Sequence, residues 1–252
     1  MAAKKFEYEG IKLGGPRHVY RQNLILRFLE GSGMKGRALD AGCGDGCVSL
    51  GLAKKGWEVH ALDYSLDFLN ILKQRLADHN LSKNVKIYHK NLEPLDFPDS
   101  FFQAVVCGEV LEHMEDDSRI ITSFNRVLQP GGVCVVTVPL LSKGWDKSDD
   151  FFGHQRLYSL DSFREMVESR GFELEKYLCW GFPLMRVYYN LIYLNWFKRM
   201  KNYSHGQRDI TARIGKSGII SYIGAQIFRF DEIFGRLQWG VGLAARLRKV
   251  SD

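Results

Sequence analysis

Residues 39–46 read Leu-Asp-Ala-Gly-Cys-Gly-Asp-Gly and place three glycines within five positions. They overlap the end of a short apolar run, residues 37–41, and precede residues 47–55, whose apolar side chains recur at helical spacing. Glycine lets a backbone turn sharply and approach a ligand closely, and a helix N-terminus offers free N–H groups and the positive end of a dipole. The stretch therefore predicts a strand, a ligand-binding loop and a helix in succession.

The chain after this loop alternates between strand-like and helix-like segments. Strands are predicted over residues 57–62, 85–89, 102–107, 133–138 and 172–179, and helices over residues 66–79, 116–128 and 159–170. Strands that alternate with helices form a parallel sheet covered on both faces, and ligands bind at the carboxyl ends of its strands. We therefore predict an α/β fold with a Rossmann-like, doubly wound, mostly parallel seven-stranded sheet.

The regular alternation breaks at residue 182. Residues 183–200 are rich in aromatic side chains, residues 201–216 are polar and basic, residues 219–237 have helical spacing, and residues 240–248 read as a last strand. We expect an N-terminal helical lid over 1–35, a cofactor-binding core over 36–181, a helical aromatic and basic insertion that caps the substrate over 182–238, and the last strand and tail over 239–252. A helix over 19–29 either covers the cofactor or packs in the core.

The composition is typical of a soluble globular protein. Of 252 residues, 45% are apolar and 25% charged, and there is no run of apolar residues long enough to span a membrane. The N-terminus lacks the apolar segment of a secretory signal. Five cysteines, odd in number and without a Cys-x-x-Cys pair, argue against a disulfide framework or a zinc site. We therefore expect a cytoplasmic protein without metal ligands.

Positive charge is concentrated in the C-terminal third. Residues 179–252 carry 12 Lys and Arg against 4 Asp and Glu, whereas residues 1–178 carry 23 against 25. Such asymmetry favours an anionic partner: a phosphate-bearing substrate, a membrane surface or a nucleic acid. Aromatic and basic residues together also suit a membrane interface. Peripheral contact with the inner face of a membrane through residues 182–216 is therefore open beside a buried cap over the substrate.

The glycine spacing argues against a dinucleotide cofactor. Dinucleotide-binding folds favour Gly-x-Gly-x-x-Gly, but here the third glycine, Gly46, comes one residue early and Cys47 occupies the expected place. Asp63 lies 17 residues beyond Gly46, at the end of the second predicted strand, where a carboxylate can accept both hydroxyls of a ribose. A tight turn followed by a helix-capping Asp is the structural alternative.

Two further stretches complete a family resemblance. Leu39–Gly46 with Asp63, Lys90–Phe97 and Cys107–His113 resemble motifs of class I S-adenosylmethionine-dependent methyltransferases, in the methyltransferase type 11 group that includes quinone-ring O-methyltransferases. The resemblance covers about residues 36–180. It implies S-adenosyl-L-methionine as cofactor, S-adenosyl-L-homocysteine as product, and cofactor contacts from Asp40, Gly42, Cys43, Gly44, Gly46, Asp63, Tyr64, Asn91, Leu92, Cys107 and Gly108.

One of these positions departs from the family pattern. Asn91 stands where the family has an Asp that bonds the adenine amino group. The amide oxygen of Asn91 can accept the same bond, although the charge is gone. Asn is also a common turn residue, so a purely local role is the alternative.

The implied chemistry is an in-line methyl transfer, for which the protein positions the acceptor and excludes water. An oxygen acceptor also loses a proton, and imidazole titrates near neutrality. His113 follows the fourth predicted strand; His154 and Arg156 lie in residues 153–159, Gly-His-Gln-Arg-Leu-Tyr-Ser, a pattern that the resemblance links to glycan or lipid-glycan pathways. These three are the catalytic candidates. Alternatively, His113 and Glu112 brace their loop, and His154 and Arg156 pin theirs through ion pairs.

The predicted function is methyl transfer to a small-molecule acceptor at oxygen, on a glycan, a lipid-linked molecule or a quinone-like ring. Two alternatives are an RNA-modifying methyltransferase and a non-catalytic partner subunit that only binds the cofactor. Residues 107–110 read Cys-Gly-Glu-Val in place of the Asn/Asp-Pro-Pro-Tyr/Phe signature of base-amine methylation, which argues against nucleic acid.

Overall fold

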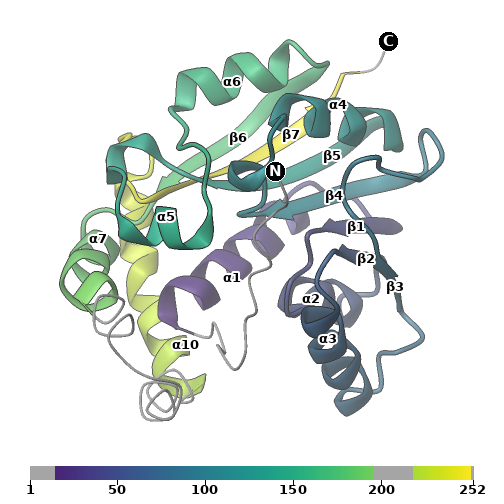
Figure 1. Cartoon of the computed structure of the whole chain (residues 1–252), viewed down its shortest axis with the longest axis horizontal. Helices are drawn as coiled ribbons and strands as arrows, with labels where there is room; N and C mark the ends of the chain where they lie inside the picture. Colours follow the sequence, from purple (N-terminus) through teal and green to yellow (C-terminus); the bar gives the residue numbers. More distant parts are fainter. Residues whose placement is uncertain (1–14, 196–217, 251–252) are drawn as a thin grey trace.

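The computed structural model describes residues 15–195 and 218–250. Its centre is a seven-stranded sheet in the order β3-β2-β1-β4-β5-β7-β6, in which β7 runs antiparallel to both of its neighbours (Figure 1). The other neighbouring strands pair in parallel. The predicted mostly parallel sheet and its last strand are confirmed. The strands are β1 (Arg37–Ala41), β2 (Glu58–Asp63), β3 (Val85–His89), β4 (Phe102–Gly108), β5 (Leu128–Pro139), β6 (Phe172–Trp180) and β7 (Gly242–Lys249).

Helices cover both faces of the sheet (Figure 1). One face carries α4 (Asp117–Val127) and α6 (Leu160–Glu168). The other carries α1 (Pro16–Glu30), α2 (Cys47–Lys54) and α3 (Leu66–Asp78), with α10 (Gly218–Ile227) packed against α1. Short helical elements complete the connections: η1 (Leu111–His113), η2 (Leu141–Lys143), α5 (Lys147–Phe152), α7 (Leu184–Tyr188), η3 (Tyr189–Tyr193) and η5 (Phe228–Phe234).

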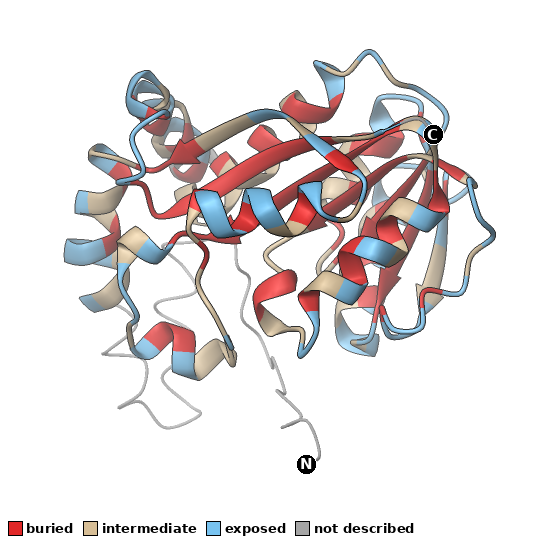
Figure 2. Cartoon of the chain, turned by 90° about the horizontal axis from the view of Figure 1, so that it is seen from above, coloured by how far each residue is buried: buried red, intermediate tan, exposed pale blue. Residues whose placement is uncertain are grey.

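The central strands are apolar at nearly every position because both of their faces are covered. Successive side chains of a strand point to opposite faces. In β4, Ala104 and Val106 lie in the core under α1, α2 and α3, whereas Val105 and Cys107 lie in the core under α4 and α6. Figure 2 shows this buried sheet between helices that are exposed on their outer sides. Burial on both faces is the expected environment of strands in a doubly wound sheet.

The order of the strands reverses at β1, which has β2 on one side and β4 on the other. In open α/β sheets, ligands bind at such a point, outside the carboxyl ends of the strands. The glycine loop, residues 42–46, follows β1 at this place. The fold therefore sets the loop where a ligand site is expected.

The helical segment between β6 and β7 differs in part from the prediction. The single helix predicted over residues 219–237 is wrong at its C-terminal end, because α10 stops at Ile227 and the 3-10 segment η5 follows. This break places the buried carboxylate of Asp231 against the backbone N–H groups of Leu184 and Met185, each at 2.9 Å. Asp231 thereby satisfies free donors in the first turn of α7.

Some predictions fall outside the described residues. These are the basic stretch over residues 201–216 and the aromatic residues Trp196 and Phe197. The division of the chain at residues 35, 181 and 238 stays a prediction. In the described part of the chain, no helix combines the length and the apolar character that crossing a membrane requires.

Candidate active site

The glycine loop between β1 and α2 is fixed by its packing. Gly42, Gly44 and Gly46 have φ values of +72°, +51° and +76°, in the left-handed region that glycine adopts without strain. A Cβ atom would lie 2.5 Å from Val110 at Gly42 and 2.2 Å from Leu72 at Gly46, whereas at Gly44 it would meet nothing within 4 Å. Gly44 therefore faces open space, and it is the point of the loop that a ligand can approach most closely.

Asp63 ties the glycine loop to β2. Its Oδ2 accepts the backbone N–H of Gly44 at 2.8 Å, and its Oδ1 accepts that of Ser65 at 2.8 Å. The carboxylate is buried, and burial raises its pKa above the ordinary value. Each carboxylate oxygen can accept a second hydrogen bond. Asp63 can therefore still accept two ribose hydroxyls, the role predicted for it.

Asp40, near the end of β1, lies beneath the same loop. It is buried, and it accepts a hydrogen bond from the hydroxyl of Ser49 at 2.6 Å. Burial raises the pKa of Asp40 to about 7. The contact holds α2 against β1, so Asp40 supports the loop from below. A direct contact of Asp40 with a cofactor stays a prediction.

The other predicted cofactor contacts lie along the same edge of the sheet. They are Cys43 in the loop, Tyr64 after β2, Asn91 and Leu92 after β3, and Cys107 and Gly108 at the end of β4. Tyr64 and Asn91 are exposed, whereas Leu92 and Cys107 are buried. Because β3, β2, β1 and β4 are adjacent, one extended ligand that lies across this edge can reach all of these positions.

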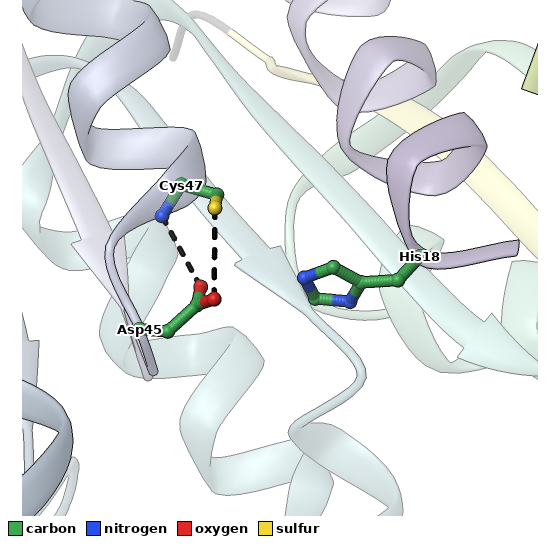
Figure 3. A group of neighbouring side chains, drawn as sticks. All are labelled: His18, Asp45 and Cys47. Atoms are coloured by element: carbon green, nitrogen blue, oxygen red, sulfur yellow. Dashed lines mark hydrogen bonds between the residues drawn. The ribbon is translucent and has the colours of Figure 1, made fainter. Parts of the chain in front are cut away.

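The N-terminal half of α1 extends over the glycine loop. His18 of α1 lies beside Asp45 and Cys47, with one ligand atom of each within 4.8 Å of the other two (Figure 3). Asp45 accepts hydrogen bonds from the backbone N–H of Cys47 at 3.3 Å and from its thiol at 3.6 Å. The C-terminal half of α1 packs in the core through Leu24 and Phe28. The helix thus combines both interpretations of its sequence: it covers the loop and it packs in the core.

A partly buried ion-pair cluster joins α1 to the residue that follows β4. Arg17 and Arg21, one turn apart on α1, approach Oε2 of Glu109 at 3.4 and 3.3 Å. Burial alone would raise the pKa of Glu109, but Arg21 and Arg17 outweigh it and lower this pKa. Our reading of the sequence missed the cluster. The one sequence signal for the cluster was the acidic residue Glu109 directly after β4. The partners of Glu109, Arg17 and Arg21, lie about 90 positions earlier in the chain.

Several buried polar atoms gather here without a hydrogen-bond partner among the described residues. They are Nε of Arg17, Nε of Arg21, Oε1 of Glu109, both carboxylate oxygens of Glu112, and Oγ1 of Thr137. Thr137 pairs with Gly108 across β5 and β4, so the group lies at the carboxyl ends of these two strands. Buried polar groups are nearly always hydrogen-bonded. Their concentration here marks a place where a polar ligand can supply the missing partners.

His113 and His154 come together at the same edge, with ring centroids 4.9 Å apart. Nδ1 of His154 lies 2.7 Å from Oδ1 of Asp149, and Nε2 lies 3.9 Å from Oε1 of Glu112. Lys143 binds the other oxygen of Asp149 at 2.6 Å. The structure therefore places both histidine candidates beside the buried Glu112.

Arg156, the third catalytic candidate, makes contacts typical of a structural residue. Its guanidinium lies 2.7 Å from Asp117 and donates to the backbone carbonyls of Met114 and Glu115 at 3.0 and 2.9 Å. These contacts fasten residues 153–159 to the loop after η1. They support the alternative interpretation, in which Arg156 pins its loop, and a catalytic contact of Arg156 stays a prediction.

Aromatic side chains from the end of β6 and from η3 form a wall next to α1. The guanidinium of Arg17 lies 5.7 Å from the ring of Trp180, 5.2 Å from that of Tyr189 and 5.7 Å from that of Tyr193, distances at which a cation is attracted to a ring face. Tyr189 also donates a hydrogen bond to Asp146 at 2.6 Å. The described part of the predicted insertion thus borders the site.

Comparisons with known proteins point to a methyltransferase domain. Residues 39–136 match the family model of the methyltransferase domain. A probable S-adenosylmethionine-dependent methyltransferase from Mycolicibacterium smegmatis is 34% identical over 140 residues, 54% of this chain and 52% of that protein. A ubiquinone biosynthesis O-methyltransferase from Psychrobacter cryohalolentis is 33% identical over 102 residues, 40% of each chain. The chain thus spans about half the length, or less, of these curated relatives.

Solved structures share the fold at low sequence identity. A putative sarcosine dimethylglycine methyltransferase from Galdieria sulphuraria superposes with a TM-score of 0.66 at 18% identity, covering 92% of this chain and 86% of that one. The cyclase SpnF superposes with a TM-score of 0.65 at 21% identity, covering 92% of this chain and 82% of that one. At these identities the likeness concerns the fold alone. One fold can host different reactions.

Proposed function

We propose that this chain, whose residues 39–136 match the model of a methyltransferase domain, is a class I S-adenosylmethionine-dependent enzyme that transfers the methyl group of that cofactor to an oxygen atom of a small-molecule acceptor. The observation that carries the proposal is the hydrogen bond between Asp63 and the N–H of Gly44. It joins a carboxylate suited to a ribose to the most accessible point of the glycine loop. The unpaired polar atoms at the ends of β4 and β5 lie farther along the same edge.

The residues present fit the cofactor. Asp63 suits the ribose, and the amide oxygen of Asn91 suits the adenine amino group. The unpaired Nε atoms of Arg17 and Arg21 and the unpaired Oε1 of Glu109 offer donors and an acceptor to the carboxylate and ammonium of the amino-acid part. The cofactor supplies an activated methyl group on a sulfonium, so the chain mainly has to position the acceptor.

The chain's own residues supply positioning and protection from water. Transfer requires the attacking oxygen, the methyl carbon and the sulfur to lie in line, and a closed site excludes water. Helix α1 covers the glycine loop, and the rings of Tyr189 and Tyr193 lie against Arg17 of this helix. Glu112, His113 and His154 lie at the edge where an acceptor hydroxyl would lose its proton. We assign the activation of the acceptor to these three side chains.

The acceptor that we propose is a quinone-like, glycan or lipid-linked molecule. The named activity of the ubiquinone relative supports a quinone-like ring. Large apolar side chains that are exposed on η3, α10 and η5 support a lipid: Leu191, Ile192, Tyr222, Ile223, Phe230 and Ile233. The excess of basic residues in 179–252 suits an anionic membrane. We therefore also propose that residues 182–216, together with the exposed apolar side chains of α10 and η5, bring the protein to the inner face of a membrane from the cytoplasm.

The first test is cofactor binding. Calorimetry with S-adenosyl-L-methionine and S-adenosyl-L-homocysteine is expected to show one site per chain, and the absence of binding by both would overturn the proposal. The second test is turnover. Purified protein is incubated with the cofactor and cell extract, and mass spectrometry searches for acceptors that gain 14 daltons. Binding without any product would favour the non-catalytic alternative.

The membrane and nucleic-acid interpretations are separated by two binding assays. Flotation with vesicles that contain anionic lipid is compared between the full chain and a variant lacking residues 184–216. If neither form floats with the vesicles, the membrane contact is wrong. RNA binding that weakens steeply with salt would instead favour the RNA-modifying alternative.

A further inference from the structure

The cluster of Glu112, His113 and His154, to which we assign the activation of the acceptor, is also a group of potential metal ligands. One ligand atom from each residue lies within 4.8 Å of the other two. Glu112 and His113 belong to η1, directly after β4, and His154 follows α5. Two loops at the carboxyl edge of the sheet therefore bring the three side chains together.

Glu112 carries the argument because its carboxylate is fully buried and has no hydrogen-bond partner in the described chain. Burying a charged or polar group without a partner is costly. Burial, followed by the neighbouring Glu109, raises the pKa of Glu112. Such a carboxylate is stabilised either by a proton or by a cation that binds both it and its neighbours.

The two imidazoles are oriented as metal-binding histidines usually are. Nδ1 of His154 contacts Oδ1 of Asp149 at 2.7 Å, and Nδ1 of His113 lies 3.5 Å from the backbone carbonyl of Gly153. A histidine that ligates a metal normally donates its other N–H to a carboxylate or carbonyl, which fixes its tautomer. With Nδ1 as the donor, Nε2 of each ring keeps its lone pair for a ligand.

Asp149 is itself held in place by neighbouring groups, and it therefore fixes the orientation of the His154 ring. The carboxylate of Asp149 binds Lys143 at 2.6 Å and accepts the backbone N–H of Asp146 at 2.8 Å. The side chains of Lys143 and Asp149 are both nearly inaccessible to solvent. Support of this kind is typical of a preformed site.

We propose that Nε2 of His113, Nε2 of His154 and the carboxylate of Glu112 bind a divalent transition-metal ion, such as Mn²⁺ or Zn²⁺, beside the methyl-transfer site. Two imidazoles and one carboxylate form a ligand set that leaves coordination positions open for a substrate. Two ligands at about 2.1 Å from one ion are at most about 4.2 Å apart. The 3.9 Å between Nε2 of His154 and Oε1 of Glu112 lies within this limit, and no pair of ligand atoms in the cluster exceeds it by more than about 0.6 Å.

This site departs from the expectation of no metal ligands, which rested on the cysteines. It rests on the proposed function and narrows the acceptor to molecules with a hydroxyl beside a second oxygen, which an ion can hold together. A bound cation lowers the pKa of a hydroxyl. The acceptor then loses its proton to water, and its oxygen forms the new O–C bond as the S–C bond of the sulfonium breaks. The sulfur retains the electron pair of that bond.

The group of His18, Asp45 and Cys47 (Figure 3) offers an internal comparison. Its ligand atoms also lie within 4.8 Å of one another. However, the guanidinium of Arg75 lies 2.9 Å from Asp45 and also contacts the sulfur of Cys47. Both ring nitrogens of His18 have partners, Arg21 and Gln22. An internal cation already satisfies this group, and we expect no metal there.

The test uses the full chain after removal of metals with a chelator. Mn²⁺ alone is added, and the free ion is measured by electron paramagnetic resonance. We expect one ion per chain, an affinity lowered at least about 10-fold in Glu112→Gln and His154→Gln, and unchanged binding in His18→Gln. Failure of the wild type to bind Mn²⁺ and Zn²⁺, or equal binding by Glu112→Gln, would overturn the proposal.

Thermal unfolding provides a control for folding. Glu112→Gln removes an unpaired charge without changing the shape of the side chain, so its metal-free melting temperature is expected at or above that of the wild type. Mn²⁺ is expected to raise the melting temperature of the wild type and leave that of Glu112→Gln unchanged. An equal rise in both proteins would place the ion elsewhere and overturn the proposal.

Calorimetry on the same metal-free protein separates this proposal from the proposed function. If S-adenosyl-L-homocysteine binds and methylation proceeds at full rate in the presence of a chelator, the metal site is wrong and the methyltransferase stands. If Mn²⁺ binds at Glu112 but neither form of the cofactor binds, the metal site stands and the proposed function is wrong.

Discussion

The backbone N–H of Gly44 donates to the carboxylate of Asp63 at 2.8 Å, so the loop after β1 and the acidic end of β2 form one unit. Gly44 gives the ligand its closest approach, while Asp63 fixes both the loop and the start of α3 through Ser65. A change at Asp63 therefore acts on the shape of the loop as well as on any hydroxyl that the carboxylate accepts.

We expect Asp63→Asn to weaken cofactor binding about 10- to 100-fold, or about 1.4–2.8 kcal/mol. The amide nitrogen of Asn can only donate, so it opposes the N–H of either Gly44 or Ser65. Calorimetry with S-adenosyl-L-homocysteine measures the change. Asp67→Asn, an exposed position in α3, is the matched control. Equal affinities for both variants would contradict the role of Asp63.

The raised pKa of Asp40 predicts that the free energy of unfolding depends on pH. Its pKa is about 7 in the folded chain, against an ordinary value of 3.8, so the folded state binds the proton more tightly. Its contribution to stability is therefore largest below the unfolded pKa and is lost as the pH rises through the folded one. Relative to Asp40→Asn, the cofactor-free wild type is expected to lose about 2–3 kcal/mol of unfolding free energy between pH 5 and pH 8. Urea unfolding at both pH values measures this difference, and a constant difference would contradict the prediction.

His154→Ala is expected to lower turnover by at least about 100-fold and to change the dissociation constant of the cofactor by less than about threefold. The residue follows α5 and lies 3.9 Å from Glu112 of η1, so we expect it to act on the acceptor and not on the cofactor. His79→Ala, at an exposed position after α3, is the control for loss of an imidazole. Methylation at the wild-type rate would remove His154 from the mechanism.

The ion pairs of Arg17 and Arg21 with Glu109 predict how the free energy of unfolding changes when these three residues are replaced in turn. Arg17→Met with Arg21→Met leaves Glu109 buried without its partners, and a lost partner of a buried charge costs about 3–5 kcal/mol. Adding Glu109→Gln removes the stranded charge and is expected to restore part of this loss. Urea unfolding of the double and triple variants measures both steps. If the triple variant is no more stable than the double variant, the unpaired Glu109 is not the cause of the lost stability.

The sequence predicted the elements of the sheet, because strand alternation and glycine spacing are local patterns. The strand over residues 242–249, the loop at 42–46 and Asp63 lie where these patterns placed them. The environment of the site was less predictable. Arg17 and Glu109 are 92 positions apart, and no local pattern links them. The break after Ile227 was missed because helical spacing continues through η5, while the contacts of Asp231 are tertiary.

The place of β7 in the sheet also constrains the order in which the protein folds. β7 lies between β5 and β6, although it follows both in the chain. During synthesis, β1 to β5 can assemble with their helices before residues 242–249 emerge. Until then β5 has a free edge and β6 lacks its partner strand, and exposed apolar edges invite pairing with other chains. The part of the sheet that carries the glycine loop, β1 to β5, can thus form early. Protection of the open edge of β5 from aggregation depends on β7, which is synthesised last of the seven strands.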